Sequence, residues 1–108
     1  MSVINVKTLS EFNNYLISKP YAVAIFSASF CKPCKEISPY IDELSASNTN
    51  ITFLKIDIEE GWEISDIYNI SSIPYFKFYR DNVEITSYCG ADKRLITEAL
   101  NQITNNTL

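Results

Sequence analysis

The chain contains no histidine, and this absence excludes several kinds of active site. Nucleophile pairs of the Ser-His and Cys-His kinds cannot form within the chain. A structural zinc site needs about four Cys or His ligands. The chain has three cysteines, so a carboxylate or a partner chain would have to complete such a site. We therefore expect no bound metal, and acid–base work falls to carboxylates, lysine or water.

Long basic runs and long apolar runs are also missing. With a net charge of −4, the chain does not suit a protein that binds nucleic acid by neutralising phosphates. No stretch approaches the roughly 18 apolar residues of a membrane span, and residues 1–6 lack the apolar core of a signal peptide. We expect a cytoplasmic protein with neither nucleic acid nor a membrane as partner. In a reducing compartment, a Cys-x-x-Cys pair indicates redox or metal chemistry rather than a lasting structural disulfide.

The length of 108 residues predicts a single domain, residues 1–108, with one core. Apolar periodicity and turn residues predict elements in the order β-α-β-α-β-α-β-β-α. Strands that alternate with helices favour parallel pairing, and a final hairpin adds an antiparallel pair. The predicted fold is therefore α/β, with a mixed sheet and helices on both faces. The predicted strands cover residues 3–6, 21–26, 51–58, 75–79 and 83–88, and the predicted helices lie between 8 and 20, at 35–44, around 64–68 and at 95–103.

Local signals predict several boundaries. Residues 8–11, Thr-Leu-Ser-Glu, fit a capping box at the start of the first helix. Pro39 should kink the second helix rather than end it, and the polar stretch 45–50 should separate that helix from the next strand. Residues 81–82, Asp-Asn, suit a two-residue hairpin turn with positive φ. The strand at 21–26 is apolar on both faces, which indicates a central position.

Cys31 and Cys34 are separated by two residues and lie where an apolar strand gives way to a helix-like segment. Free backbone amides and the helix dipole favour a negative charge at a helix start, which lowers the pKa of Cys31. Lys32 and Lys35 add positive charge nearby. Pro33 restricts the backbone and favours ring closure. The pair is therefore predicted to act as a disulfide that opens and closes.

Several separated segments share one family pattern: Ala28–Lys35, Pro39, Lys55-Ile56-Asp57, Ser72-Ile73-Pro74 and Gly90-Ala91. Together they make the chain resemble the thioredoxin family over essentially its whole length. The resemblance implies a thioredoxin fold, with a mixed five-stranded sheet flanked by four helices, and an enzyme that reduces protein disulfides. It also implies no bound cofactor, an NADPH-dependent thioredoxin reductase as electron supply, and disulfide-containing target proteins as partners. We expect a monomer.

The same resemblance assigns roles to individual residues. Cys31 is the exposed nucleophile that attacks a target disulfide, and Cys34 is the more buried resolving thiol. The bond before Pro74 is implied to be cis, in a loop that faces the cysteines and pairs with an extended target peptide. Lys32 and Pro33 complete the motif. The apolar groove around Cys31 is expected to comprise Phe30, Ile58, Ile73, Cys89, Gly90 and Ala91.

The chain departs from the usual pattern of the family at the motif and behind it. Phe30 and Lys32 replace the Trp and Gly of Trp-Cys-Gly-Pro-Cys. Ile25 stands where the family carries a buried Asp that is thought to relay protons to the second thiol. The remaining candidates to take the proton from that thiol are Lys55, Glu36 and water, and Lys55 is expected to tune the pKa of a cysteine. We expect slower resolution than in a typical member.

Four residues have two interpretations each. Cys89 either fills a small apolar space or is a third reactive thiol. Lys55 either faces the cysteines or extends along the surface. Trp62 either packs in the core or borders the groove, and the bond before Pro74 is either cis or an ordinary trans bond in a turn.

The function also has alternatives. The chain fits a disulfide oxidase or isomerase of the protein-disulfide-isomerase type, because residues of the motif do not fix the direction of exchange. It also fits a non-catalytic interaction module that uses only the groove. Insulin reduction separates an enzyme from a module, and the reduction potential separates a reductase from an oxidase.

Overall fold

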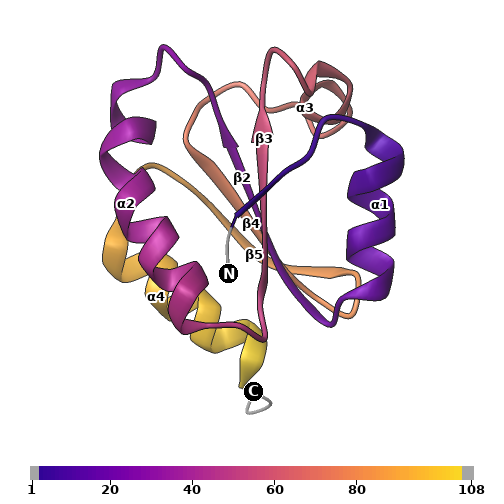
Figure 1. Ribbon diagram of the computed structural model, residues 1–108, viewed down its shortest axis with the longest axis vertical. Helices are drawn as coiled ribbons and strands as arrows, with labels where there is room; N and C mark the ends of the chain where they lie inside the picture. Colours follow the sequence, from indigo (N-terminus) through magenta and orange to yellow (C-terminus); the bar gives the residue numbers. More distant parts are fainter. Residues whose placement is uncertain (1–2, 106–108) are drawn as a thin grey trace.

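Residues 3–105 are described by the structure, a computed structural model (Figure 1). The predicted order of strands and helices is confirmed. The elements are β1 (Ile4–Asn5), α1 (Leu9–Ser18), β2 (Tyr21–Ser27), α2 (Lys32–Ser47), β3 (Thr52–Asp57), α3 (Trp62–Ile67), β4 (Tyr75–Arg80), β5 (Val83–Cys89) and α4 (Lys93–Thr104). The prediction of a single domain over residues 1–108 extends beyond the described residues at both ends and stays a prediction.

One five-stranded sheet carries these elements, in the order β1-β3-β2-β4-β5. β1, β3 and β2 run parallel, whereas β4 runs antiparallel to both β2 and β5. The predicted mixed sheet is therefore confirmed. β2 lies at the centre and is buried from Ala22 to Ser27, as a strand that is apolar on both faces must be.

Helices cover both faces of the sheet, with α2 and α4 on one side and α1 and α3 on the other (Figure 1). Successive strand residues point to opposite faces. Val23 and Ile25 of β2 therefore belong to one apolar cluster, and Ala24 and Phe26 belong to the other. Both clusters hold β2 in place, and its last residues support the cysteine motif that follows.

The predicted boundary signals of α1 and of the hairpin are confirmed. The Glu11 N–H donates to Thr8 Oγ1 at 3.1 Å and caps α1, and the Lys7 N–H donates to Glu11 Oε1 at 3.3 Å. These bonds satisfy amides that have no partner inside the helix. Asp81 and Asn82 form the turn between β4 and β5, with φ values of 51° and 66°.

The predicted boundaries of α2 are wrong at both ends. The helix begins at Lys32, earlier than predicted, because Cys31 takes the N-cap position. It continues through much of the predicted polar break to Ser47. It ends where the backbone and side-chain amides of Asn48 each donate to the Leu44 carbonyl at 2.9 Å. Within this segment Ser45 is buried, and Ala46 and Ser47 are exposed, all three on a helical backbone.

α2 continues past Pro39, as predicted. Smaller differences from the predicted ranges concern β5 and α4. β5 extends to Cys89, which is therefore a strand residue and not a loop residue. α4 begins two residues before the predicted range 95–103, and its buried residues are Ile96, Ala99, Leu100 and Ile103.

Candidate active site

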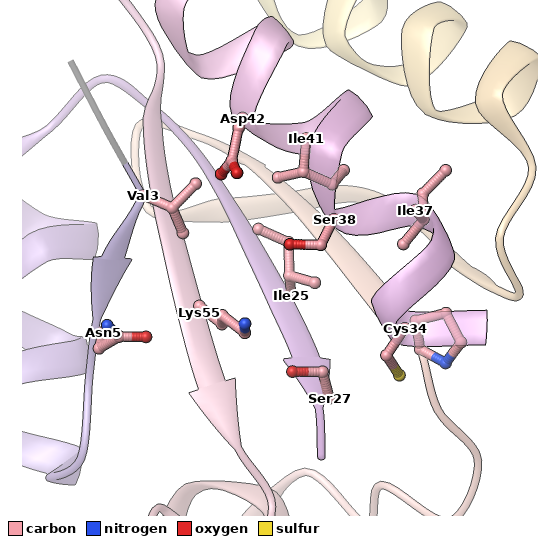
Figure 2. Close-up of a pocket in the computed structure, with 11 residues that line it drawn as sticks. Val3, Asn5, Ile25, Ser27, Cys34, Ile37, Ser38, Ile41, Asp42 and Lys55 are labelled. Carbon is pink, nitrogen blue, oxygen red and sulfur yellow. The ribbon is translucent and has the colours of Figure 1, made fainter. Parts of the chain in front are cut away.

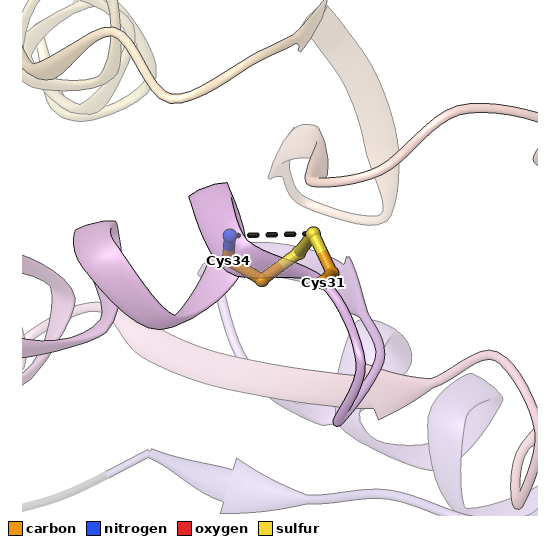
Figure 3. The surroundings of a disulfide bond; sticks show 2 residues. All are labelled: Cys31 and Cys34. Atoms are coloured by element: carbon orange, nitrogen blue, oxygen red, sulfur yellow. Dashed lines mark hydrogen bonds between the residues drawn. A yellow bond between two sulfur atoms is a disulfide. The ribbon is translucent and has the colours of Figure 1, made fainter.

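Cys31 directly precedes α2, Cys34 lies in the first turn of that helix, and a disulfide bond joins them (Figure 3). Their Cα atoms are 5.3 Å apart. Cys31 is the N-cap of α2, and its Sγ accepts a hydrogen bond from the Cys34 N–H at 3.3 Å. The side-chain oxygen of an ordinary N-cap residue accepts a bond in the same way. This amide, at the positive end of the helix dipole, is positioned to stabilise a Cys31 thiolate.

The predicted difference in burial between the two cysteines is wrong. Each is 7% exposed, and Ile58 and Ile73 pack against the cluster that both cysteines form with Ala28. The thiols differ instead in their surroundings, because Cys34 lines a hollow in the protein and Cys31 caps the helix. Position relative to a helix start does not determine exposure, since residues distant in sequence, Ile58 and Ile73, pack against this cluster.

The other residues of the motif are exposed. Pro33 lies in the first turn of α2, where its missing N–H leaves no helical hydrogen bond unmade. Lys32 and Lys35 are exposed beside it and place positive charge at the surface of the motif. Glu36, a predicted candidate base for Cys34, is also exposed. Glu36 is not among the residues that line the hollows beside Cys34, so its carboxylate is not positioned there to accept the Cys34 proton.

The peptide bond before Pro74 is cis, as the resemblance implied. Pro74 directly precedes β4, which pairs with β2 through Tyr75 and Phe26. The pairing brings Pro74 to the end of β2 that carries the cysteines, and Pro74 lines a hollow together with Cys34. The Gly90 N–H donates to the Pro74 carbonyl at 2.8 Å, which ties this loop to the end of β5.

The predicted groove residues fall into two groups. Ile58 and Ile73 contact the cysteine cluster directly. Phe30 is 66% exposed in the loop before α2, and Ala91 is exposed after β5. Gly90 has a φ of 112° and open space where a side chain would begin. Two of the predicted groove residues therefore contact the cysteine cluster, and the others contribute exposed surface.

Cys89 and Trp62 are both more exposed than their packing interpretations required. Cys89 pairs with Tyr75 across β4 and β5, and its free thiol is exposed. The interpretation of Cys89 as a filler of an apolar space is therefore wrong, and its position agrees with an accessible third thiol. Trp62 begins α3 and is 65% exposed, so it is not a core residue.

A hollow of about 260 Å³ lies behind Cys34, where α2 faces β2 and β3 (Figure 2). Lys55 lines this hollow and is half-buried, which agrees with the interpretation that it faces the cysteines. Its neighbour on β2 is Ile25, which gives the hollow an apolar wall. Sequence reasoning missed Ser38 and Asp42, which also line it. Their spacing of four and eight residues from Cys34, on one face of a helix, was the available signal.

The charged groups of this hollow take part in none of the ion pairs found among residues 3–105. Those pairs are Lys77–Glu84 and Arg94–Glu98. The same part of the chain contains no cluster of three or more His, Cys, Asp or Glu side chains able to hold a metal ion. None of its helices is both long and apolar enough to cross a membrane.

Comparison with known proteins agrees with this geometry. A sequence model of the family described as Thioredoxin matches residues 3–102. The chain belongs to the thioredoxin family. It is 30% identical to Thioredoxin 1 of Plasmodium falciparum over 95 residues, which cover 88% of this chain and 91% of that protein. It is 31% identical to Thioredoxin-2 of Saccharomyces cerevisiae over 99 residues, which cover 91% and 95%.

Solved structures of thioredoxins have the same fold. The crystal structure of thioredoxin from Trypanosoma brucei brucei superposes with a TM-score of 0.91 at 25% identity, covering 97% of this chain and 93% of that one. The expected thioredoxin fold is therefore confirmed. Thioredoxins reduce protein disulfides through a Cys-x-x-Cys dithiol, and Cys31 and Cys34 fit this motif and form a disulfide. The protein is a thiol–disulfide oxidoreductase of this family.

Proposed function

We propose that Cys31 is the attacking thiol and Cys34 the resolving thiol of a protein-disulfide reductase. The hydrogen bond from the Cys34 N–H to Cys31 Sγ is the observation that carries this assignment. A sulfur at the N-cap gains most from the helix amides and dipole when it is a thiolate, and the thiolate is the nucleophile in disulfide exchange. Lys32 and Lys35 add positive charge at the same helix end.

The exchange proceeds in two steps. The Cys31 thiolate attacks one sulfur of the target disulfide, forms a mixed disulfide, and releases the other target sulfur as a thiolate that takes a proton. Cys34 then loses its proton and attacks Cys31 Sγ. The Cys31–Cys34 bond forms, the mixed disulfide breaks, and the second target sulfur leaves and is protonated. Two electrons have passed from the protein dithiol to the target.

The loop that carries Pro74 and the surface around it provide the target site in this proposal. An extended target peptide pairs with the backbone of Ile73, and its apolar side chains contact Ile58 and Phe30. Cys89, Gly90 and Ala91 form the far side of this groove. Ile58 and Ile73 support the assignment because they already contact the cysteine cluster.

The wider setting follows from the family. We propose that the chain is one domain over residues 1–108, binds no cofactor, and receives electrons from an NADPH-dependent thioredoxin reductase. Disulfide-containing proteins of the cytoplasm are its targets, and it serves electron transport and redox homeostasis there. It works as a monomer without nucleic acid or membrane, and the net charge of −4 supports the absence of nucleic acid.

Trapping tests the roles of the two cysteines. All variants carry Cys89→Ser, because the exposed Cys89 thiol would form adducts of its own. Reduced Cys34→Ser is mixed with insulin, and intact mass is expected to show a mixed disulfide on Cys31. The matched Cys31→Ser variant should form none and should reduce insulin no faster than dithiothreitol alone. An adduct that accumulates on Cys34 instead would reverse the assignment. The direction of exchange is tested separately, by measuring the reduction potential of the Cys31–Cys34 pair.

A further inference from the structure

Two adjoining hollows lie beside Cys34, with volumes of about 260 Å³ and about 610 Å³. Figure 2 shows the first, with the Cys34 sulfur near one end and polar atoms from α2 and β3 along its sides. The residues that line both hollows are a thiol, two hydroxyls, an amine and a carboxylate. They are Cys34, Ser27, Ser38, Lys55 and Asp42.

The polar groups on α2 form a line from the buried thiol to solvent. Cys34, Ser38 and Asp42 are spaced four residues apart, so they lie one above another on a single helix face. Cys34 is buried, Ser38 is half-buried and Asp42 is exposed. A water molecule occupies about 30 Å³ of liquid and needs two to four polar partners. The hollow therefore has both the room and the lining for a short chain of waters.

Asp42 is the carboxylate of this region that is free to accept a proton. The charged residues around the hollows are Lys35 and Asp42 from α2 and Lys55 and Asp57 from β3. Asp57 Oδ1 already accepts the N–H groups of residues 59 and 60 at 2.8 and 3.1 Å. The Asp42 carboxylate forms no side-chain hydrogen bond and no ion pair within residues 3–105. β1 and β2 contribute no titratable side chain to the lining, and β2 contributes the apolar Ile25.

We propose that Asp42 accepts the proton that Cys34 loses during resolution, through water in this hollow, while the Lys55 ammonium stabilises the thiolate that forms. The proposal rests on the role of Cys34 given under Proposed function. The Cys34 S–H bond breaks, its proton passes through water to an Asp42 carboxylate oxygen, and the Cys34 thiolate attacks Cys31 Sγ. The departing target thiolate takes a proton from solvent, and Asp42 returns its proton to solvent. Asp42 does not touch the reacting sulfurs, so it is a positioning and relay residue.

A charge effect alone would act in the opposite direction. Removing a carboxylate near a thiol favours the thiolate, so Asp42→Asn would speed resolution if Asp42 acted only through its charge. Removing a proton acceptor slows resolution. The sign of the change therefore separates the two roles.

The test uses reduced full-length protein and the chromogenic disulfide dithiobis(nitrobenzoate), in a Cys89→Ser background for every variant. Cys31 releases one thionitrobenzoate when it attacks, and Cys34 releases the second when it resolves, so stopped-flow absorbance reports the two steps in turn. We expect Asp42→Asn to slow the second release about tenfold at neutral pH, less than the roughly 10²–10⁴-fold effect of a general acid or base that contacts the reacting group, because water in the hollow can still take the proton. The first release should be unchanged. The deficit should shrink as pH rises, because hydroxide then removes the proton.

Matched variants make the result decisive. Glu43→Gln removes the same charge from the next exposed position of α2, outside the hollow, and should match the parent. Asp42→Glu should recover most of the lost rate. The relay would be overturned if Asp42→Asn released the second thionitrobenzoate as fast as Glu43→Gln, or faster. It would also be overturned if the lower rate of Asp42→Asn did not vary with pH. Retention of both releases in Cys34→Ser would instead overturn the proposed cysteine roles.

Discussion

Two lysines on the strands that flank β2 have opposite surroundings. Lys77 on β4 is 8% exposed, forms an ion pair with Glu84 at 2.9 Å, and lies over the rings of Tyr68 and Tyr75. Lys55 on β3 is half-buried, lines the hollow behind Cys34, and has no ion-pair partner within residues 3–105. The charge of Lys77 is paired with Glu84, whereas Lys55 lines the hollow beside Cys34 without an ion-pair partner in the described part of the chain.

The difference extends to the two faces of the sheet. On the side of α1 and α3, large side chains such as Phe12 and Phe26 are fully buried in one apolar cluster. On the side of α2, a hollow stays open behind Cys34, and polar as well as apolar residues line it. Close-packed interiors respond to small volume changes with a loss of stability, whereas substitutions at the hollow should change the rate of resolution if the proposed relay operates. Substitutions on the two faces should therefore separate stability from rate.

The largest effect is expected in the filled face. Phe12 is fully buried, and its ring contacts the rings of Tyr68 and Tyr79 at centroid distances of 5.7 and 6.3 Å. Phe12→Ala should lower the free energy of unfolding by about 3–5 kcal/mol, measured by urea denaturation. The rate of thionitrobenzoate release from the folded variant should be unchanged. A loss of stability below about 1 kcal/mol would mean that this face is not closely packed.

The same substitution at the two lysines should give opposite results. Lys77→Met keeps the apolar stem but removes the ion pair and two ring contacts, and it should cost about 1–2 kcal/mol of stability. The value is modest because the Glu84 side chain is 40% exposed and can be hydrated. Lys55→Met should change stability by less than about 0.5 kcal/mol. It should slow the second thionitrobenzoate release about threefold to tenfold, the effect of removing one favourable charge near a thiolate.

Denaturation midpoints and release rates of the two lysine variants, measured side by side, check this prediction. The first release serves as the internal control, because it depends on Cys31 and not on the hollow. If Lys55→Met lost as much stability as Lys77→Met and kept its rate, the contrast between the two lysines would fail.

The smallest effect concerns alkaline pH. Burial, together with Tyr68 and Glu84 nearby, raises the pKa of the Tyr79 hydroxyl far above its usual value. In the unfolded chain a tyrosine ionises near pH 10, so above about pH 10 the unfolded state releases a proton that the folded state keeps. Stability then falls as pH rises. Tyr79→Phe should remove up to about 1.4 kcal/mol of this fall per pH unit, measured as the slope of unfolding free energy between neutral and alkaline pH. Equal slopes in the two proteins would contradict it.

Much of the fold was predictable because its signals are local. The apolar run of β2, the capping residues of α1 and the turn residues Asp81 and Asn82 each act through neighbours in the chain. The end of α2 was mispredicted because residues 45–47, Ser-Ala-Ser, have the composition of a loop. In the structure Ser45 is buried and Ala46 and Ser47 are exposed, a burial pattern that only tertiary packing reveals.

The sequence by itself determined the chemistry available to this protein: a cysteine pair at a helix start, a proline before β4, and no histidine. Tertiary structure decided the rest. Cys31 and Cys34 are equally buried, Cys89 is exposed, and Lys55 lines the same hollow as Cys34, and each of these facts depends on how separate elements pack. The periodicity of a single segment does not encode contacts between elements that are far apart in the chain.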